Sequence, residues 1–171
     1  MKILADLFID ELAGMYDAEQ RIARSLPQLI AAVTCHKLQS TLENHLQETQ
    51  DHVSKLEQIF EAIGLDSRSK ICEAIHGMLK EADKLVADFK GSPAINAAII
   101  SVVQKLAHHE IASYGCLLEW AGLLEHESAA GVLKEILSEE KATDMALTGL
   151  ARSGKNEEAC DLAAGSPQPG N

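Results

Sequence analysis

Apolar residues recur every three or four positions through four long stretches of the chain. This spacing places them on one face of an α-helix and leaves polar residues on the opposite face. It predicts amphipathic helices over residues 4–33, 38–63, 92–124 and 128–151. Helices with one apolar face bury it against one another, so the pattern predicts an all-α fold.

Glycine and proline mark several ends of these helices. Gly64 predicts the end of the second helix, because glycine readily adopts the left-handed conformation that stops a helix. Ser92 and Pro93 predict the start of the third helix, as cap and first helical residue. Pro27 lies inside the first helix and predicts a kink one turn before its end, since proline removes a backbone donor.

The lengths of the connections predict the topology. Short turns join the first helix to the second and the third to the fourth, whereas residues 65–92 form a long connection between the two pairs. Apolar positions in this connection allow one or two short helices, and we interpret it as a crossover rather than a core element. Two antiparallel hairpins joined by one long crossover describe a ferritin-like four-helix bundle.

The chain length and composition favour one domain. A chain of 171 residues with 46% hydrophobic content can build one proper core. We expect the bundle to span residues 1–152. We expect residues 153–171 to form a disordered tail, because this segment holds too little apolar surface to order itself.

Charge and cysteine content exclude several functions. A net charge of -11 argues against nucleic acid or anionic lipid as partner, because both require a basic surface. A carboxylate as early as Asp6 argues against a signal peptide, and no uncharged apolar run of about 18 residues follows. These features predict a cytoplasmic protein without membrane contact. The four cysteines form no C-x-x-C pair and are expected to be reduced thiols.

Four glutamates fall near the middle of the four predicted helices. Glu110 and Glu140 lie on the apolar stripes themselves, Glu19 lies at the edge of its stripe, and Glu48 lies nearer the flank. His45 and His52 stand three residues before and four residues after Glu48, toward the core side. A buried carboxylate must be protonated, hydrogen-bonded, paired with a cation or bound to a metal ion.

The spacing of these glutamates suggests that they meet. Glu19 and Glu48 are 29 residues apart, and Glu110 and Glu140 are 30 apart, so each hairpin brings its two carboxylates to one level. Pseudo-symmetric packing of the hairpins would merge the two levels. On a helical wheel the nearby cations project toward solvent: Arg21, Arg24, Lys55, Lys105, Lys134 and Lys141.

Converging carboxylates without a cation raise one another's pKa unless a metal ion sits among them. Oxygen-rich ligands with one or two imidazoles suit iron or manganese better than a structural zinc ion. The alternative for Glu110 and Glu140 is a neutral acid bonded to a neighbouring tyrosine or serine, and the alternative for Glu19 and Glu48 is a solvated flank. We interpret His45 and His109 as core-edge histidines. Tyr16 and Tyr114 are either donors to metal ligands or packing residues.

Short motifs follow one another in a specific order over residues 1–151. They are Asp6-Leu7-Phe8, Asp10-Glu11-Leu12, Tyr16-Asp17-Ala18-Glu19, Glu48-Thr49, Leu56-Glu57-Gln58-Ile59-Phe60, Cys72-Glu73-Ala74, His109-Glu110-Ile111-Ala112-Ser113-Tyr114-Gly115 and Glu139-Glu140-Lys141-Ala142. In this order they resemble the YciE/YciF-type stress-response family of ferritin-like proteins. The resemblance implies a stress-induced homodimeric helical bundle with a carboxylate-rich, di-iron-type centre.

The resemblance also implies a ligand set, taken residue by residue. It consists of Glu19, Glu48 with His52, Glu110, and Glu140 with Asp144.

The chain departs from the usual pattern at three positions. Di-iron bundles usually place a histidine three residues after a ligand glutamate, but Asp51 and Thr143 stand there in this chain. Ala107 stands where relatives place another glutamate. The number of metal ions therefore stays open between one and two.

Three functions stay open. The chain is a di-iron oxidoreductase that acts on dioxygen or peroxide, or a non-catalytic bundle that binds iron or a small ligand, or a structural stress protein with a vestigial site. For the oxidoreductase we expect iron as the metal, and manganese is the alternative.

Overall fold

The computed structural model describes residues 1–155, which form five α-helices and a short π-helical turn. The helices are α1 (Leu4–Ala32), α2 (His36–Ala62), α3 (Glu73–Asp88), α4 (Ile95–Leu123) and α5 (Glu127–Leu150), and the turn is η1 (Ala151–Lys155). The all-α prediction is confirmed. The predicted tail lies, from residue 156 onward, outside the described residues. Among residues 1–155, no helix is both long and apolar enough to cross a membrane.

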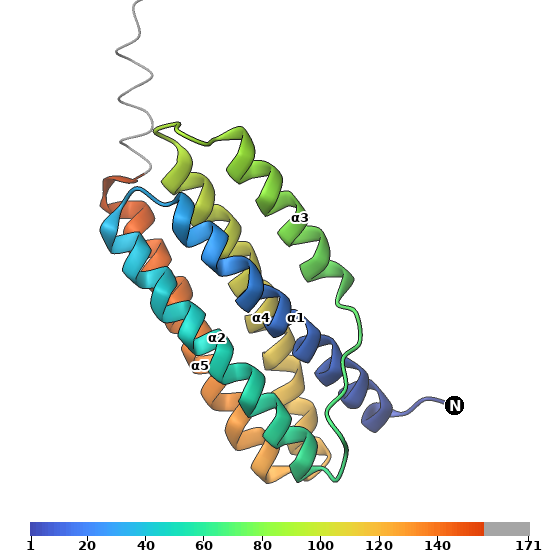
Figure 1. Cartoon of the computed structure of the whole chain (residues 1–171). Coiled ribbons are helices and arrows are strands. Elements are labelled where there is room, and N and C mark those ends of the chain that lie inside the picture. Colours follow the sequence, from blue (N-terminus) through green and yellow to red (C-terminus); the bar gives the residue numbers. More distant parts are fainter. Residues whose placement is uncertain (156–171) are drawn as a thin grey trace, which may run out of the picture.

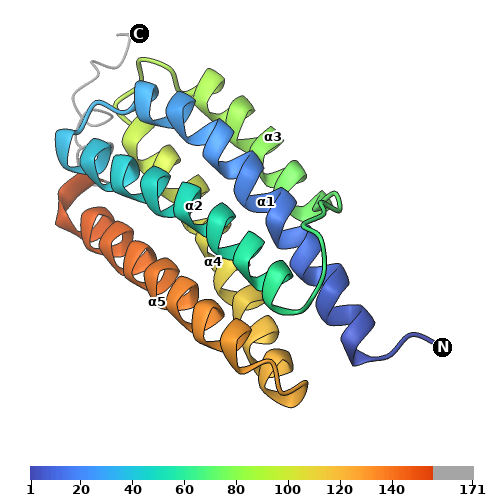
Figure 2. The same cartoon turned by 60° about the horizontal axis from the view of Figure 1, so that its bottom comes forward.

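Four of the helices form the bundle. Helices α1 and α2 make one antiparallel hairpin and α4 and α5 make the other, while α2 packs against α5 and α1 packs against α4 (Figures 1 and 2). The connection between the hairpins returns along the length of the molecule before α4 begins (Figure 1). This is the predicted ferritin-like topology with one crossover.

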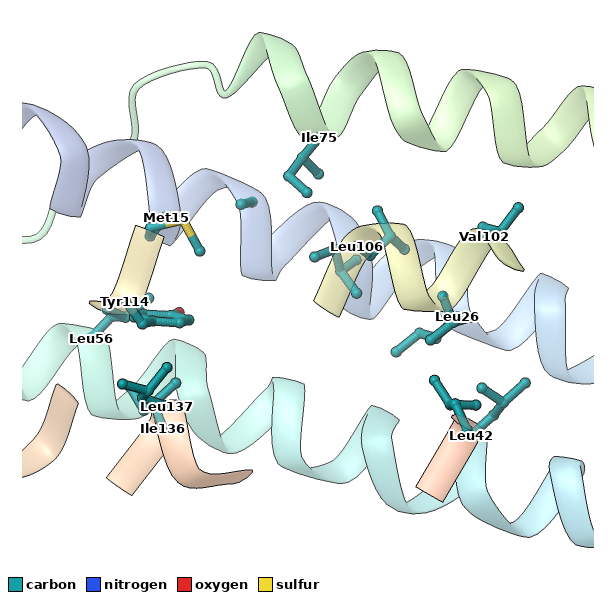
Figure 3. Packing of buried hydrophobic residues seen from close by; sticks show 14 of the residues in the cluster. Met15, Leu26, Leu42, Leu56, Ile75, Val102, Leu106, Tyr114, Ile136 and Leu137 are labelled. Carbon is teal, nitrogen blue, oxygen red and sulfur yellow. The ribbon is translucent and has the colours of Figure 1, made fainter. Parts of the chain in front are cut away.

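The crossover contributes to the core, and our interpretation of it as a non-core segment was wrong. It contains the single helix α3, which packs along α1 and α4. Ile75, Ala82 and Val86 of α3 are buried, and Figure 3 shows Ile75 pointing from α3 toward the bundle. These positions are seven and four residues apart, so they form one stripe on a helix. A short amphipathic stripe was enough to attach α3 to the bundle.

Helix α2 ends at the predicted glycine. Gly64 has φ +75, and its N–H donates to the carbonyl of Glu61 at 3.0 Å, while Leu65 N–H donates to the carbonyl of Phe60 at 2.9 Å. These two bonds form a Schellman motif. The end of α4 has the same pair of bonds, but Glu125 occupies the left-handed position with φ 60.

Helix α4 begins two to three residues later than predicted. Ser92 Oγ accepts a hydrogen bond from Ala94 N–H at 3.1 Å, and Ser92 carbonyl accepts one from Ile95 N–H at 3.1 Å. Ser92 therefore closes a turn that precedes the helix. Pro27 lies on the exposed side of α1, and the helix continues through it to Ala32.

A layer of apolar side chains crosses the bundle about one helical turn from the level of the four glutamate and histidine residues described below. Figure 3 shows Met15, Leu56, Tyr114 and Ile136, one from each helix of the bundle, within the same part of the core. Each stands four residues, about one helical turn, from one of Glu19, His52, Glu110 and Glu140. The helices of each hairpin are antiparallel, and the crossover makes α4 run in the same direction as α2 (Figure 1), so all four shifts run in the same direction along the bundle. The apolar layer therefore closes one side of a polar layer.

Candidate metal centre

The polar layer holds five side chains from four helices. Glu19 comes from α1, His45 and His52 from α2, Glu110 from α4 and Glu140 from α5, and all five are 0% exposed. Their possible ligand atoms form two groups, each spanning at most 4.8 Å: Glu19 with His52 and Glu140, and His45 with Glu110 and Glu140. Glu140 belongs to both groups.

Glu140 lies between the two histidines. Its Oε1 atom is 3.5 Å from Nδ1 of His52 and 4.0 Å from Nδ1 of His45. Nδ1 of His52 is also 3.4 Å from Oε1 of Glu19. Glu140 would therefore help to hold an ion bound by either group.

Polar atoms in this layer lack hydrogen-bond partners. Within residues 1–155, eight buried side-chain nitrogen and oxygen atoms have no partner, and all belong to these five residues. They are Glu19 Oε2, His45 Nδ1 and Nε2, His52 Nδ1, and both carboxylate oxygens of Glu110 and of Glu140. Buried polar atoms in folded proteins almost always have a partner. The donor set therefore fits metal ions, which carboxylate and imidazole atoms ligate.

No lysine or arginine of residues 1–155 pairs with the three glutamates, although the imidazole of His52 lies 3.4 Å from Glu19 and 3.5 Å from Glu140. In the part of the chain that the structure describes, no lysine or arginine nitrogen lies within 4 Å of their oxygens. Lys55, however, does not project fully into solvent as predicted, because its side chain is only 18% exposed. It pairs with Glu135 and Glu139, both at 2.9 Å, at the edge of the polar layer.

The electrostatics of the layer favour either protons or metal ions on the glutamates. Burial and the neighbouring Glu140 and Glu19 raise the pKa of Glu110 well above its ordinary value. Burial and the charge of Glu19 raise the pKa of Glu140 to about 8. Without an ion, Glu140 carries a proton at neutral pH.

The two histidines differ in charge. Burial lowers the pKa of His45 to about 4, so this imidazole is neutral. Burial alone would also lower the pKa of His52, but the nearby carboxylates of Glu19 and Glu140 and the hydrogen bond with Glu139 raise it to about 9. A metal ion at Nδ1 of His52 would take the place of that proton.

Further contacts orient the candidate ligands. Nε2 of His52 is 2.8 Å from Oε2 of Glu139, which also accepts a hydrogen bond from Lys55 at 2.9 Å. Tyr114, which is fully buried, donates a hydrogen bond to Oε1 of Glu19. Tyr114 is thus a donor to a candidate ligand. Tyr16 is not, since its hydroxyl donates to Glu57 near the surface.

Two predicted ligands lie outside both groups. Glu48 is half-buried and accepts a hydrogen bond from Thr143 at 3.2 Å, although its charge helps to raise the pKa of Glu140. Asp144 turns toward α4, where it accepts a hydrogen bond from Gln104 at 3.1 Å and lies 3.3 Å from Nε2 of His108. The geometry supports Glu19, His52, Glu110 and Glu140 as one cluster. A ligand role for Glu48 or Asp144 stays a prediction.

His45 joins the cluster although we interpreted it as a core-edge histidine. It lies seven residues before His52, which is two helical turns, so both imidazoles point from the same face of α2. Glu48 lies about 60° from His45 around the helix. The paired histidines at this spacing were the signal in the sequence that identifies His45.

Comparisons with known proteins agree with this fold. A family described as a domain of unknown function, DUF892, matches residues 3–160. Protein YciF of Escherichia coli (strain K12) is 38% identical over 163 residues, which cover 93% of this chain and 96% of YciF.

Two solved structures are similar over most of the chain. The crystal structure of the E. coli stress protein YciF matches with a TM-score of 0.86 and 38% identity, covering 91% of this chain and 99% of that one. YcfI of Rhodopseudomonas palustris, provisionally described as a structural protein, matches with a TM-score of 0.83 and 36% identity, covering 86% and 94%. The chain therefore belongs to the DUF892 family, of the YciF type.

Proposed function

We propose that this chain binds two iron ions, or manganese as the alternative, at a carboxylate-bridged centre in the middle of the bundle. Glu19, His52 and Glu140 hold one ion, and His45, Glu110 and Glu140 hold the other. The proposed activity is oxidation by, or detoxification of, dioxygen or peroxide during stress. The stress role is proposed by analogy with the E. coli stress protein YciF.

One observation carries the proposal. The eight unpartnered atoms all belong to the five residues of two groups that share Glu140. Three carboxylates and two imidazoles form a donor set that iron and manganese accept. Two divalent ions would offset the three carboxylate charges, whereas a vestigial site would leave these atoms without partners.

The chain's own residues explain what the site would contribute. Two reduced iron ions, when bound, would supply electrons to dioxygen or peroxide. The apolar layer containing Met15 and Ile136 excludes water from one side of the ligands. Tyr114 holds Glu19, and Glu139 holds His52, so both ligands are oriented before an ion arrives.

Anaerobic titration with ferrous iron tests the proposal. The full chain should bind two equivalents, and subsequent addition of dioxygen or peroxide should change the near-ultraviolet absorption with turnover of the oxidant. The Glu110→Gln, Glu140→Gln double variant should lose metal uptake while it keeps its helix content by circular dichroism.

Glu119→Gln is the matched control, because Glu119 is an exposed glutamate of the same helix as Glu110. This control should bind iron like the natural chain. Full metal binding by the double variant would exclude Glu110 and Glu140 as ligands.

The second candidate is a chain without catalytic activity. It would be either a bundle that binds iron or a small ligand, or a structural stress protein. Ala107, which is buried on α4, stands where the family resemblance predicts another glutamate. The description of YcfI as a structural protein points in the same direction. Binding of iron without oxidant turnover would support the binding module, and absence of binding would support the structural protein.

We further propose that the chain forms a homodimer. Large apolar side chains are exposed near the first turn of α1 and in the loop after α2, namely Ile3, Leu7, Leu65 and Ile71. Such exposed apolar surface favours association with a partner. Light scattering coupled to gel filtration should give twice the mass of 18.4 kDa; the mass of a single chain at micromolar concentration would reject the dimer.

A further inference from the structure

A cavity outside the polar layer extends to a residue of the bundle interior. It has a volume of about 240 Å³ and lies between α1, the loop before α3, and α4. Lys70 and Glu73 in its wall are exposed to solvent, whereas Met15 in its wall is only 1% exposed. One water molecule takes up about 30 Å³ in the liquid, so the cavity has room for several small molecules. It therefore leads from solvent to a buried side chain.

Met15 separates this cavity from the polar layer. It stands one helical turn before Glu19 on α1, so both side chains project from the same face of the helix. Figure 3 shows Met15 and Tyr114 in the same part of the core, and the hydroxyl of Tyr114 donates to Glu19. A molecule that moves along α1 from the cavity toward Glu19 has to pass Met15.

The walls of the cavity are held in place by backbone hydrogen bonds. Lys70 N–H donates to the carbonyl of Ala13 at 3.0 Å, and Cys72 N–H donates to Oδ2 of Asp17 at 3.0 Å. These two bonds fix the loop before α3 against α1. Gly14 also lines the cavity, and a Cβ added there would meet nothing within 4 Å. The missing side chain of Gly14 thus contributes to the empty space.

The polar residues of the wall suit a small neutral molecule better than an ion. Asp10 already pairs with two lysine side chains, each at 3.1 Å. Within residues 1–155, Glu11, Cys72 and His109 do not form a group of three ligand atoms close enough to share an ion. Their nitrogen, oxygen and sulfur atoms can still exchange hydrogen bonds with a hydroxyl group. Burial raises the pKa of the Cys72 thiol, so this group reacts slowly with an oxidant.

The side chain of Met15 is suited to moving aside. Methionine is unbranched, with three rotatable bonds, and it adapts to irregular space more easily than other apolar side chains. Leu56 and Ile136, which belong to the same apolar layer, are branched and buried. Met15 is therefore the member of that layer that can change rotamer at the smallest cost in packing.

We propose that hydrogen peroxide enters the bundle through this cavity and reaches the carboxylate-bridged centre past Met15. This inference rests on the function proposed above and selects peroxide as the oxidant. Peroxide is close to water in size, carries no charge at neutral pH, and can donate and accept hydrogen bonds along the polar wall. Dioxygen lacks hydrogen-bond donors and gains less from such a wall.

Oxidation of methionine tests the route without any metal ion. Peroxide transfers one oxygen atom to a thioether: its O–O bond breaks, an S–O bond forms, the sulfur loses two electrons and water is released. The full chain, stripped of metals, is treated with hydrogen peroxide, and each methionine is followed by peptide mass spectrometry. Met145, which is 69% exposed, provides the reference rate.

The natural chain alone gives a decisive result. A buried methionine without a route reacts only in the unfolded fraction, which is on the order of 10⁻³ or less of the molecules. With the proposed route, Met15 should be oxidised within about tenfold of the rate of Met145. A rate for Met15 near a thousandth of that of Met145 would overturn the proposal.

A variant that fills the cavity provides the second test. Gly14→Leu places a side chain in the empty space and should slow the oxidation of Met15 about tenfold or more, with Met145 unchanged. Gly115→Leu is the matched control, because Gly115 is a half-buried glycine within α4 that also has free space at its Cβ but does not line this cavity. Both variants gain the same helix propensity. Equal rates for Met15 in the natural chain and in Gly14→Leu would contradict the route.

The chain loaded with ferrous iron links the route to the centre. Gly14→Leu should slow the reaction of the bound iron with peroxide while the affinity for ferrous iron stays unchanged; an unchanged reaction rate would show that peroxide reaches the centre elsewhere. A natural chain that binds no iron would reject the proposed function, whereas the oxidation of Met15 would still report on the route.

Discussion

Nε2 of His52 lies 2.8 Å from Oε2 of Glu139, and this contact directs Nδ1 of His52 toward Glu19 and Glu140. Burial opposes the charge of Glu139, but the hydrogen bonds from Lys55 and His52 outweigh burial and lower its pKa. A carboxylate behind a ligand histidine fixes the tautomer and orientation of the ring. Glu139 therefore positions a candidate ligand without reaching the ion.

Replacement of Glu139 by alanine should weaken metal binding. The loss of this carboxylate should lower the affinity for Mn²⁺ or Fe²⁺ about tenfold or more, because an unsupported histidine samples other orientations. Glu139→Gln, which keeps a hydrogen-bond acceptor, should have a smaller effect. Anaerobic equilibrium dialysis gives the dissociation constants.

Glu135→Ala is the control for this experiment. Glu135 pairs with the same Lys55 at 2.9 Å but belongs to neither ligand group and makes no contact with His52. Its removal should leave the affinity unchanged. Equal losses in the two variants would mean that Lys55, rather than the contact with His52, accounts for the effect.

The stability of the metal-free protein should fall as the pH rises above 6.5. Between pH 6.5 and about 8, folded Glu140 and folded His52 each hold a proton that the unfolded chain has released. The free energy of unfolding should therefore fall by on the order of 1–2 kcal/mol per pH unit. Urea unfolding after chelation of metals measures this slope.

Below pH 6.5 the decline should be less steep than above it. The raised pKa values of Glu140 and Glu110 still make the folded state less stable as the pH rises from 4.5, but His45 offsets part of this effect, because it is neutral when folded and protonated when unfolded. Glu140→Gln should flatten the decline above pH 6.5, and Glu119→Gln should not. A stability that rises between pH 6.5 and 8 would contradict the protonation states given for the layer.

Removal of the Tyr114 hydroxyl should destabilise the protein. Tyr114 donates to Glu19 in the fully buried layer, so Tyr114→Phe leaves a buried carboxylate oxygen without this donor. The free energy of unfolding should fall by about 1–3 kcal/mol. Tyr16→Phe is the matched control, because its hydroxyl bonds Glu57 near the surface, and it should cost less. Chemical denaturation compares the two, and a larger loss for Tyr16→Phe would refute the role of Tyr114.

Replacement of Glu125 by glycine should stabilise the turn between α4 and α5. Glu125 adopts φ 60, which is strained for a residue with a side chain, whereas Gly64 occupies the equivalent position after α2. Glu125→Gly should raise the free energy of unfolding by about 0.5–1 kcal/mol.

Gly64→Ala should lower the stability by a similar amount. A Cβ at Gly64 meets nothing within 4 Å, so the effect would come from the backbone conformation and not from a clash. Thermal melts of both variants provide the measurement, and a destabilised Glu125→Gly would argue against strain at this turn.

The positions that sequence reasoning identified most clearly are those where charge interrupts an apolar stripe. Glu110 and Glu140 stand on such stripes, and both are fully buried. Asp144 was assigned by family resemblance, yet it lies about 40° from Glu140 around α5 and bonds Gln104 of α4. A helical wheel predicts the direction of a side chain only to within a fraction of a turn. This precision is too low to distinguish the direction of Asp144, toward α4, from the direction of Glu140, toward the bundle interior.

Helical periodicity, turn residues and connection lengths were sufficient to predict the four long helices, their hairpin pairing and the crossover, because each depends on contacts between residues close in the chain. The role of α3 in the core was decided by the tertiary structure, and so was the placement of His45, whose spacing from His52 was its signal in the sequence, within ligand distance of Glu140. Both depend on how far each helix rotates about its axis as it packs. That rotation is set by interlocking side chains of helices distant in sequence, and it decides which polar atoms lie within ligand distance of Glu140.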